Sequence, residues 1–164
     1  MKKLIVLSIL ALGVMTQSFA QKFGHANFEE IVSMLPERAK AEKEVQDLQQ
    51  TLEGRLSSMY ETYQTKAAEF QTDTISQAVR ASLQQELQDL ERRIQEFQQT
   101  ASTEIQTKQN ELMSVMFEKV RTAATEVGKA NEYTYIFDSS PSSGVLLYAG
   151  GEDVTPMIKT QLGI

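Results

Sequence analysis

The sequence predicts a mainly α-helical fold with a small β body, from which a long antiparallel helical hairpin extends. Between Pro36 and Gly128 the chain has no further proline and a single glycine, Gly54. Its apolar residues recur there at a helical period. Short strand-like segments stand before and after this stretch, so a hairpin of helices would bring them together into one sheet.

The first twenty residues have the form of a cleaved signal peptide. Lys2 and Lys3 precede an apolar run at 4–15, and Ser18-Phe19-Ala20 is a small-x-small cleavage site. The alternative is a retained membrane anchor, although the run is shorter than the roughly 20 apolar residues that a span needs. We expect cleavage after about Ala20 and export of the mature chain.

Composition narrows the possible chemistry. The chain has no Cys, which removes disulfides, thiol nucleophiles and thiolate metal sites. Without Lys2 and Lys3 the formal charge changes from −6 to −8, with 14 basic against 22 acidic residues. An acidic chain lacks the electrostatic footprint of a nucleic-acid-binding protein.

The body is expected to begin with a strand at 23–27. Asn27-Phe28-Glu29-Glu30 has the Asn-x-x-Glu form of a helix start, and a short helix should follow it. Pro36 suits the first turn of the next helix, where its missing N–H costs nothing.

Two helices make up the predicted arm, and their apolar seam has an eleven-residue spacing. On the returning helix the spacing is carried by Val79, Leu90, Ala101, Leu112 and Ala123. That repeat gives about 3.67 residues per turn and a nearly straight seam. The break is expected at 71–74, with Thr74 and Gln77 forming a capping box.

After Gly128 the pattern becomes strand-like. The segment at 133–137 alternates, 138–144 is a Ser-rich turn, and 145–149 is predicted as a second strand of a β-hairpin. Thr155-Pro156 then starts a closing helix. The expected division is leader 1–20, body 21–36, arm 37–111 and the rest of the body 112–164.

A sheet of so few short strands has marginal stability by itself, and it therefore needs further strands as partners. Symmetric association of several copies is the simplest way to provide those strands. The expected contributors to the body and its assembly are apolar: Phe23, Ala26, Met113, Met116, Phe117, Tyr135, Phe137, Val145 and Leu147.

No catalytic, cofactor-binding or metal-binding set is found in the sequence. His25 is the single histidine, Gly150-Gly151 is a plain turn, and the carboxylates lie along helix faces. We therefore expect a protein that is not an enzyme and needs no cofactor.

Aromatic and Met positions widen the apolar stripe in the outer half of the arm. Most should be seam residues, and those left outward would mark an interaction site. The candidates are Met59, Tyr60, Tyr63, Phe70, Ile75, Val79 and Phe97.

The order of these segments resembles the Skp/OmpH-like periplasmic chaperone family over the whole mature chain. The most specific part is Tyr133 to Asp138, the Ser-rich turn, Val145 to Ala149, and Glu152-Asp153-Val154-Thr155 before the last helix. The resemblance implies a jellyfish-like homotrimer whose helical arms enclose a cavity. It implies an ATP-independent holdase that keeps unfolded outer-membrane β-barrel proteins soluble for membrane assembly.

The charge departs from that family, whose best-known members are strongly basic. Residues 37–130 carry 12 basic and 16 acidic residues, and the arm tip at 66–80 has no net charge. We therefore expect weak membrane contact and more reliance on apolar contacts. The alternative function is an exported coiled-coil structural or tethering protein of the cell envelope.

Overall fold

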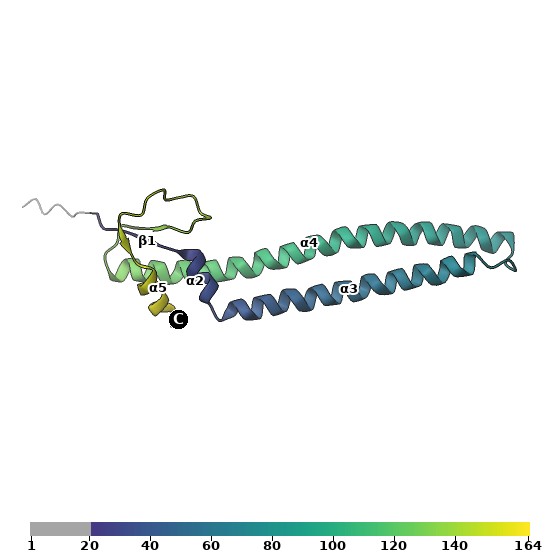
Figure 1. Ribbon diagram of the computed structural model, residues 1–164, viewed down its shortest axis with the longest axis horizontal. Helices are drawn as coiled ribbons and strands as arrows, with labels where there is room; N and C mark the ends of the chain where they lie inside the picture. The colour runs from purple at the N-terminus through teal and green to yellow at the C-terminus, as the bar shows by residue number, and fades with distance from the viewer. Residues whose placement is uncertain (1–20) are drawn as a thin grey trace, which may run out of the picture. The chain divides into compact units, whose positions relative to one another are not determined.

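The computed structural model describes residues 21–164, so the predicted signal peptide lies outside the described residues. The elements in chain order are β1 (Phe23–Ala26), α2 (Phe28–Met34), α3 (Glu37–Phe70), α4 (Gln77–Ala130), β2 (Tyr135–Asp138), β3 (Glu152–Asp153) and α5 (Thr155–Leu162) (Figure 1). The prediction of a mainly helical chain with long helices and a small sheet is confirmed.

The chain divides into two units, which we call the body and the arm. The body contains the described residues up to Glu29 together with Thr122–Gly163, and the arm is Glu30–Arg121. Helix α4 therefore contributes residues 77–121 to the arm and 122–130 to the body. The expected division at residues 36 and 111 was drawn from the sequence pattern and stays a prediction.

Helices α3 and α4 form the antiparallel hairpin of the arm (Figure 1). Helix α4 has 54 residues, which at 1.5 Å per residue is about 80 Å. Two helices cannot enclose a seam completely, so few side chains on this stretch are buried, among them Leu52, Leu83 and Ile94. Much of the remaining seam stays half-buried.

The link between the helices is held by Arg80 and Ser76. The Arg80 guanidinium donates to the carbonyl oxygens of Phe70 at 3.0 Å and Thr72 at 3.3 Å, which satisfies acceptors at the end of α3. The Val79 N–H donates to Ser76 Oγ at 3.3 Å. Ser76 rather than Thr74 is therefore the residue at the start of α4, and the predicted capping box was wrong by two positions.

The body sheet has three parallel-paired strands in the order β2-β1-β3. One face contains Gly24, Ala26 and Ile136, and it is the covered face: Gly24 and Ala26 are buried. A Cβ at Gly24 would lie 3.1 Å from the Tyr133 ring and from Val154 Cγ1, so any larger residue there would push these neighbours away from the sheet. The body core consists of Ala26, Ala123, Ala124, Val127, Val154 and Ile158.

The predicted β-hairpin is not formed within the described residues. Val145–Ala149 is not a strand, and the third strand is Glu152–Asp153, which pairs with β1. A strand-like pattern indicates that a segment could fit into a sheet, but the segment forms a strand only where a neighbouring strand is present to pair with it. In the part of the chain that the structure describes, no strand pairs with Val145–Ala149.

Polar contacts join the body segments at the ends of the strands. Asp138 Oδ1 accepts from the Phe28 N–H at 3.4 Å, and Ser140 Oγ accepts from the Glu29 N–H at 3.0 Å. These bonds satisfy free amides in the first turn of α2. Asp153 Oδ1 accepts from the Thr155 N–H at 2.9 Å at the start of α5. The start of α2 is therefore closed by side chains from a segment distant in sequence, and the start of α5 by Asp153, two residues before Thr155.

Replacing Gly54 with Ala is expected to stabilise the arm by about 0.5–1 kcal/mol, because glycine is a poor helix former. A Cβ at Gly54 would meet no atom within 4 Å, so nothing opposes the gain. Gly163 is the matched control, since its φ of 74° should make Gly163→Ala destabilising. Urea unfolding of both variants measures the difference, and a loss of stability in Gly54→Ala would contradict the argument.

Candidate binding surfaces

The outer face of the body sheet contains a cluster of stacked aromatic rings. Phe23 and Tyr135 have ring centroids 6.0 Å apart, and Phe137 lies 5.9 Å from Tyr135 and 6.3 Å from Phe23. Their side chains remain 44%, 57% and 36% exposed. These residues share one face because strands alternate and Phe23 is in register with Tyr135. We call Phe23, Tyr135 and Phe137 the aromatic face.

The loop between β2 and β3 exposes further apolar side chains to water. Val145 is 58% exposed, Leu147 is fully exposed and Tyr148 is 86% exposed. Val145 and Leu147 were among the residues expected to take part in assembly, and Tyr148 was missed although it lies in the same strand-like segment. Such a group of exposed large apolar residues typically marks an interaction site.

The remaining body candidates differ in exposure. Ala26 and Met116 are buried inside the chain, whereas Met113 and Phe117 are 44% and 40% exposed. Met113 and Phe117 lie one helical turn apart on α4, on the same side of the helix. Val115 and Met34 are exposed as well.

Most of the candidate residues in the outer half of the arm pack in the seam between α3 and α4. Tyr60 and Val79 are exposed. The others are half-buried: Met59, Tyr63, Phe70, Ile75 and Phe97. Tyr63 Oη donates to Glu91 Oε1 at 2.6 Å, and Gln98 Nε2 donates to Tyr60 Oη at 3.0 Å. Of the seven residues, Tyr60 and Val79 therefore present the most apolar surface outward.

Ion pairs cross the arm between the two helices. Lys66 pairs with Glu86, Lys119 pairs with Glu37, and Lys108 Nζ lies 2.8 Å from Glu44 Oε2. The hydrogen bond from Lys66 holds the pKa of the Glu86 carboxyl below its ordinary value. Their side chains are about one third to one half exposed, so the pairs align the helices while each contributes little to stability.

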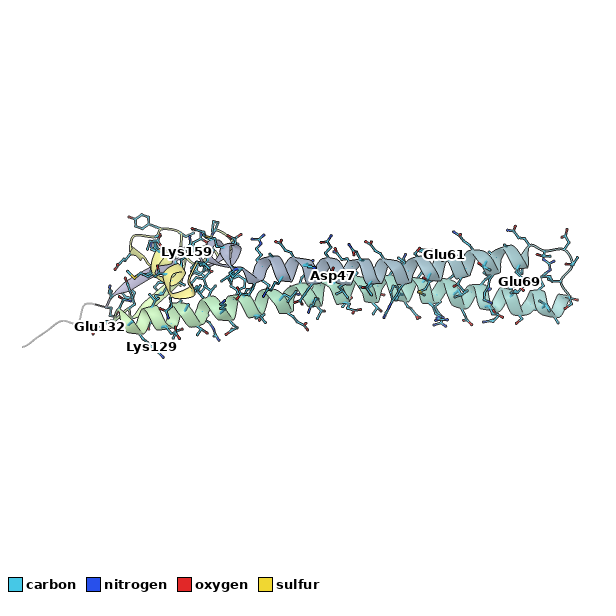
Figure 2. The ribbon with its side chains drawn as sticks, turned by 90° about the horizontal axis from the view of Figure 1, so that it is seen from below. Asp47, Glu61, Glu69, Lys129, Glu132 and Lys159 are labelled. Atoms are coloured by element: carbon cyan, nitrogen blue, oxygen red, sulfur yellow. The ribbon has the colours of Figure 1, made fainter. Side chains whose placement is uncertain are left out.

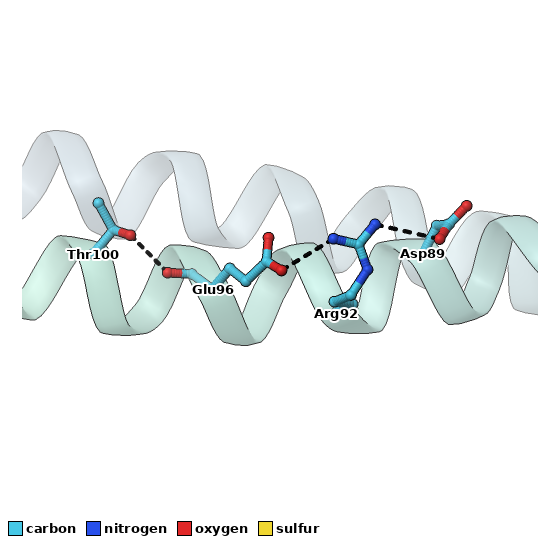
Figure 3. A network of polar contacts seen from close by, with 4 residues as sticks. All are labelled: Asp89, Arg92, Glu96 and Thr100. Atoms are coloured by element: carbon cyan, nitrogen blue, oxygen red, sulfur yellow. Dashed lines mark hydrogen bonds and ion pairs between the residues drawn. The ribbon is translucent and has the colours of Figure 1, made fainter.

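Charged side chains also cover the outside of the helices (Figure 2), where Asp47, Glu61 and Glu69 lie along α3. On α4, Arg92 donates to Glu96 Oε1 at 3.0 Å and to Asp89 Oδ1 at 3.4 Å (Figure 3). Thr100 Oγ1 donates to the Glu96 carbonyl oxygen at 2.8 Å. This arrangement is an exposed helix surface and not a catalytic group of carboxylates.

Within residues 21–164, no group of three or more His, Asp or Glu side chains is placed to hold a metal ion. Over the same part of the chain, no helix combines the length and apolar character needed to cross a bilayer. The surfaces that remain as candidates are the aromatic face, the exposed loop and the outward apolar residues of the arm.

Comparisons with known proteins agree with this fold. Residues 22–162 match the family model described as outer membrane protein (OmpH-like). A crystal structure from Caulobacter crescentus CB15, described as an outer membrane chaperone (OmpH-like), has a similar fold, with a TM-score of 0.70 and 15% sequence identity. The match covers 87% of this chain and 83% of that one. No curated protein sequence matches the chain significantly.

Proposed function

The chain belongs to the OmpH-like outer membrane protein family, and from this premise we propose that it is an ATP-independent periplasmic holdase. Its clients are unfolded outer-membrane β-barrel proteins, which it encloses between helical arms and keeps soluble for membrane assembly. The observation that carries the proposal is the aromatic face, because a protein that builds such a chamber needs a hub at which several arms meet.

The hub is formed by three copies joined through their sheets. Each copy brings strands of four, four and two residues, which is too little sheet for independent stability. Strands β2 and β3 are both edge strands with one unpaired side. Val145–Ala149 supplies a strand-like segment that has no partner strand among the described residues of its own chain, and a neighbouring copy offers the open edge that it needs.

The arms hold clients by many weak apolar contacts. Tyr60 and Val79 leave apolar surface outward in the outer half of the arm, where most other exposed side chains are polar. Enclosure by three arms makes the later contacts intramolecular, so weak single contacts give tight overall retention. Met side chains such as Met113 adapt to varied sequences, which suits a binder of many clients. No nucleotide is required, since each step is a binding equilibrium.

The experiment is a dilution assay with residues 21–164. An outer-membrane β-barrel protein, unfolded in urea, is diluted with and without the purified chain, and its aggregation is followed by light scattering without nucleotide. We expect suppression at about one trimer per client. If several unrelated barrel proteins aggregate unchanged, the proposed function is wrong.

A double variant tests the contribution of the arm. We expect Tyr60→Ser with Val79→Ser to weaken client binding by about tenfold, from the loss of about 1.5 kcal/mol of apolar contact. The matched control replaces two exposed polar residues of the same helices, Gln64→Ser and Gln84→Ser. Fluorescence titration of a labelled client measures the client affinity of both double variants. Equal affinity of the two double variants would remove Tyr60 and Val79 from the binding surface.

A further inference from the structure

A histidine and a carboxylate face each other on the outer side of the body sheet. His25 of β1 is in register with Asp153 of β3 and with Phe137 of β2. Residues in register on neighbouring strands have their side chains on the same face. His25 and Asp153 therefore belong to the same surface as the aromatic face, on the side opposite Gly24 and Ala26.

The groups around His25 come from each neighbouring segment. On the β2 side, His25 Nδ1 lies 3.3 Å from Ser139 Oγ. On the β3 side the charged neighbour is Asp153, on which the charge of Lys159 from α5 also acts. The other two acidic residues of the strands are on the covered face: Asp138 accepts bonds from Phe28 and Ser140, and Glu152 pairs with Lys22 at 3.5 Å. Asp153 is thus the acidic residue that faces His25.

The Asp153 carboxylate is kept ionised. Desolvation acts to raise the pKa of Asp153, but the hydrogen bonds from Thr155 and then the charges of His25 and Lys159 outweigh it, and the pKa lies below its ordinary value. The carboxylate is consequently a fixed negative charge over the range in which histidine changes its own charge, about pH 5 to 8.

We propose that proton uptake by His25 strengthens the joining of copies through the aromatic face, so that the assembly tightens as the pH falls. The inference rests on the trimer proposed above and adds a regulation of that same surface. Burying the aromatic face removes Asp153 from water, and the negative charge is costly to bury even though the Thr155 N–H donates a hydrogen bond to it. A protonated imidazole on the neighbouring strand neutralises it.

The direction of the pH dependence follows from the linkage between proton binding and assembly. In separate chains the pair is in water, where the attraction is weak and screened. In the assembly the same pair lies in a medium of lower dielectric constant, where the attraction is stronger. The assembled form therefore binds protons more strongly than the separate chains, and the equilibrium moves toward assembly as protons are added.

The test is sedimentation equilibrium of residues 21–164 at pH 5.5 and pH 8.0. For three copies we expect the association constant to be larger at pH 5.5 on the order of 100-fold. His25→Gln should reduce this ratio to near one. Asp153→Asn should do the same, and Asn retains a side-chain oxygen for the start of α5. Asp47→Asn, on α3 of the arm, is the control that should keep the full pH dependence.

The outcomes separate the two proposals. A trimer whose association constant is equal at both pH values, or whose pH dependence survives in His25→Gln, overturns the pH switch and leaves the proposed function standing. A chain that stays monomeric at both pH values overturns the switch together with the trimer. Circular dichroism of each variant at both pH values shows that the compared chains are folded.

Discussion

Replacing Phe137 with Asp is expected to convert the assembled protein to single chains. The Phe137 ring stacks on Phe23 and Tyr135 and is exposed in the lone chain, so its replacement leaves the covered face of the sheet untouched. In the assembly the new carboxylate would be buried against the Phe23 and Tyr135 rings in every copy, and burying a charge among apolar groups is costly. A cost of about 3 kcal/mol per copy is about 100-fold per copy in the association constant.

Sedimentation velocity at micromolar concentration measures this effect, with circular dichroism to show that the helices persist. Tyr60→Asp is the matched control, because it places the same charge at an exposed aromatic position of the arm. The control should keep the mass of the wild-type assembly. A Phe137→Asp chain that sediments like the wild type would exclude the aromatic face as the assembly surface.

Ile158→Ala is expected to destabilise the protein by about 3 kcal/mol. Ile158 is fully buried in the body, and removing buried methyl groups costs both transfer free energy and a cavity. Val115→Ala is the control, since Val115 is 68% exposed and should lose less than about 0.5 kcal/mol. The measurement is urea unfolding at one fixed chain concentration, because assembly couples stability to concentration. Equal midpoints for the two variants would contradict the observed core.

The long helices could be predicted because their signal is repeated many times. The seam repeat spans several turns, and the observed α3 and α4 end within two residues of the expected limits. Single-residue features were harder. The start of α4 uses Ser76 Oγ instead of Thr74, because neighbouring Ser and Thr residues offer the same capping chemistry and only the backbone path chooses between them.

The small sheet was predicted only in part. Strands β1 and β2 carry aromatic and alternating residues, and they were expected. Strand β3 consists of Glu152 and Asp153, which have little strand preference, so its pairing with β1 depends on tertiary structure. The opposite error occurred at Val145–Ala149, where a strong strand pattern has no partner strand within residues 21–164. That mismatch is itself an argument for a partner from another copy.

The residues of the candidate surfaces could be predicted from their apolar and aromatic character, but the direction in which each side chain points could not. The sequence indicated a widened apolar stripe around Met59 and Tyr60, and one residue of helical rotation separates a seam position from a free one. The structure places Met59 half-buried and Tyr60 exposed. The phenolic contact of Tyr63 with Glu91 joins residues on two helices, which no local pattern encodes.

The central claim is that three copies complete one hub from sheets that are too small alone. Multi-angle light scattering of residues 21–164 at micromolar concentration tests it most directly, with and without an unfolded barrel protein. The account predicts three times the mass of one chain, and the mass of three chains plus one client after loading. A folded species with the mass of a single chain, unchanged by the client, would contradict both the trimer and the chamber built on it.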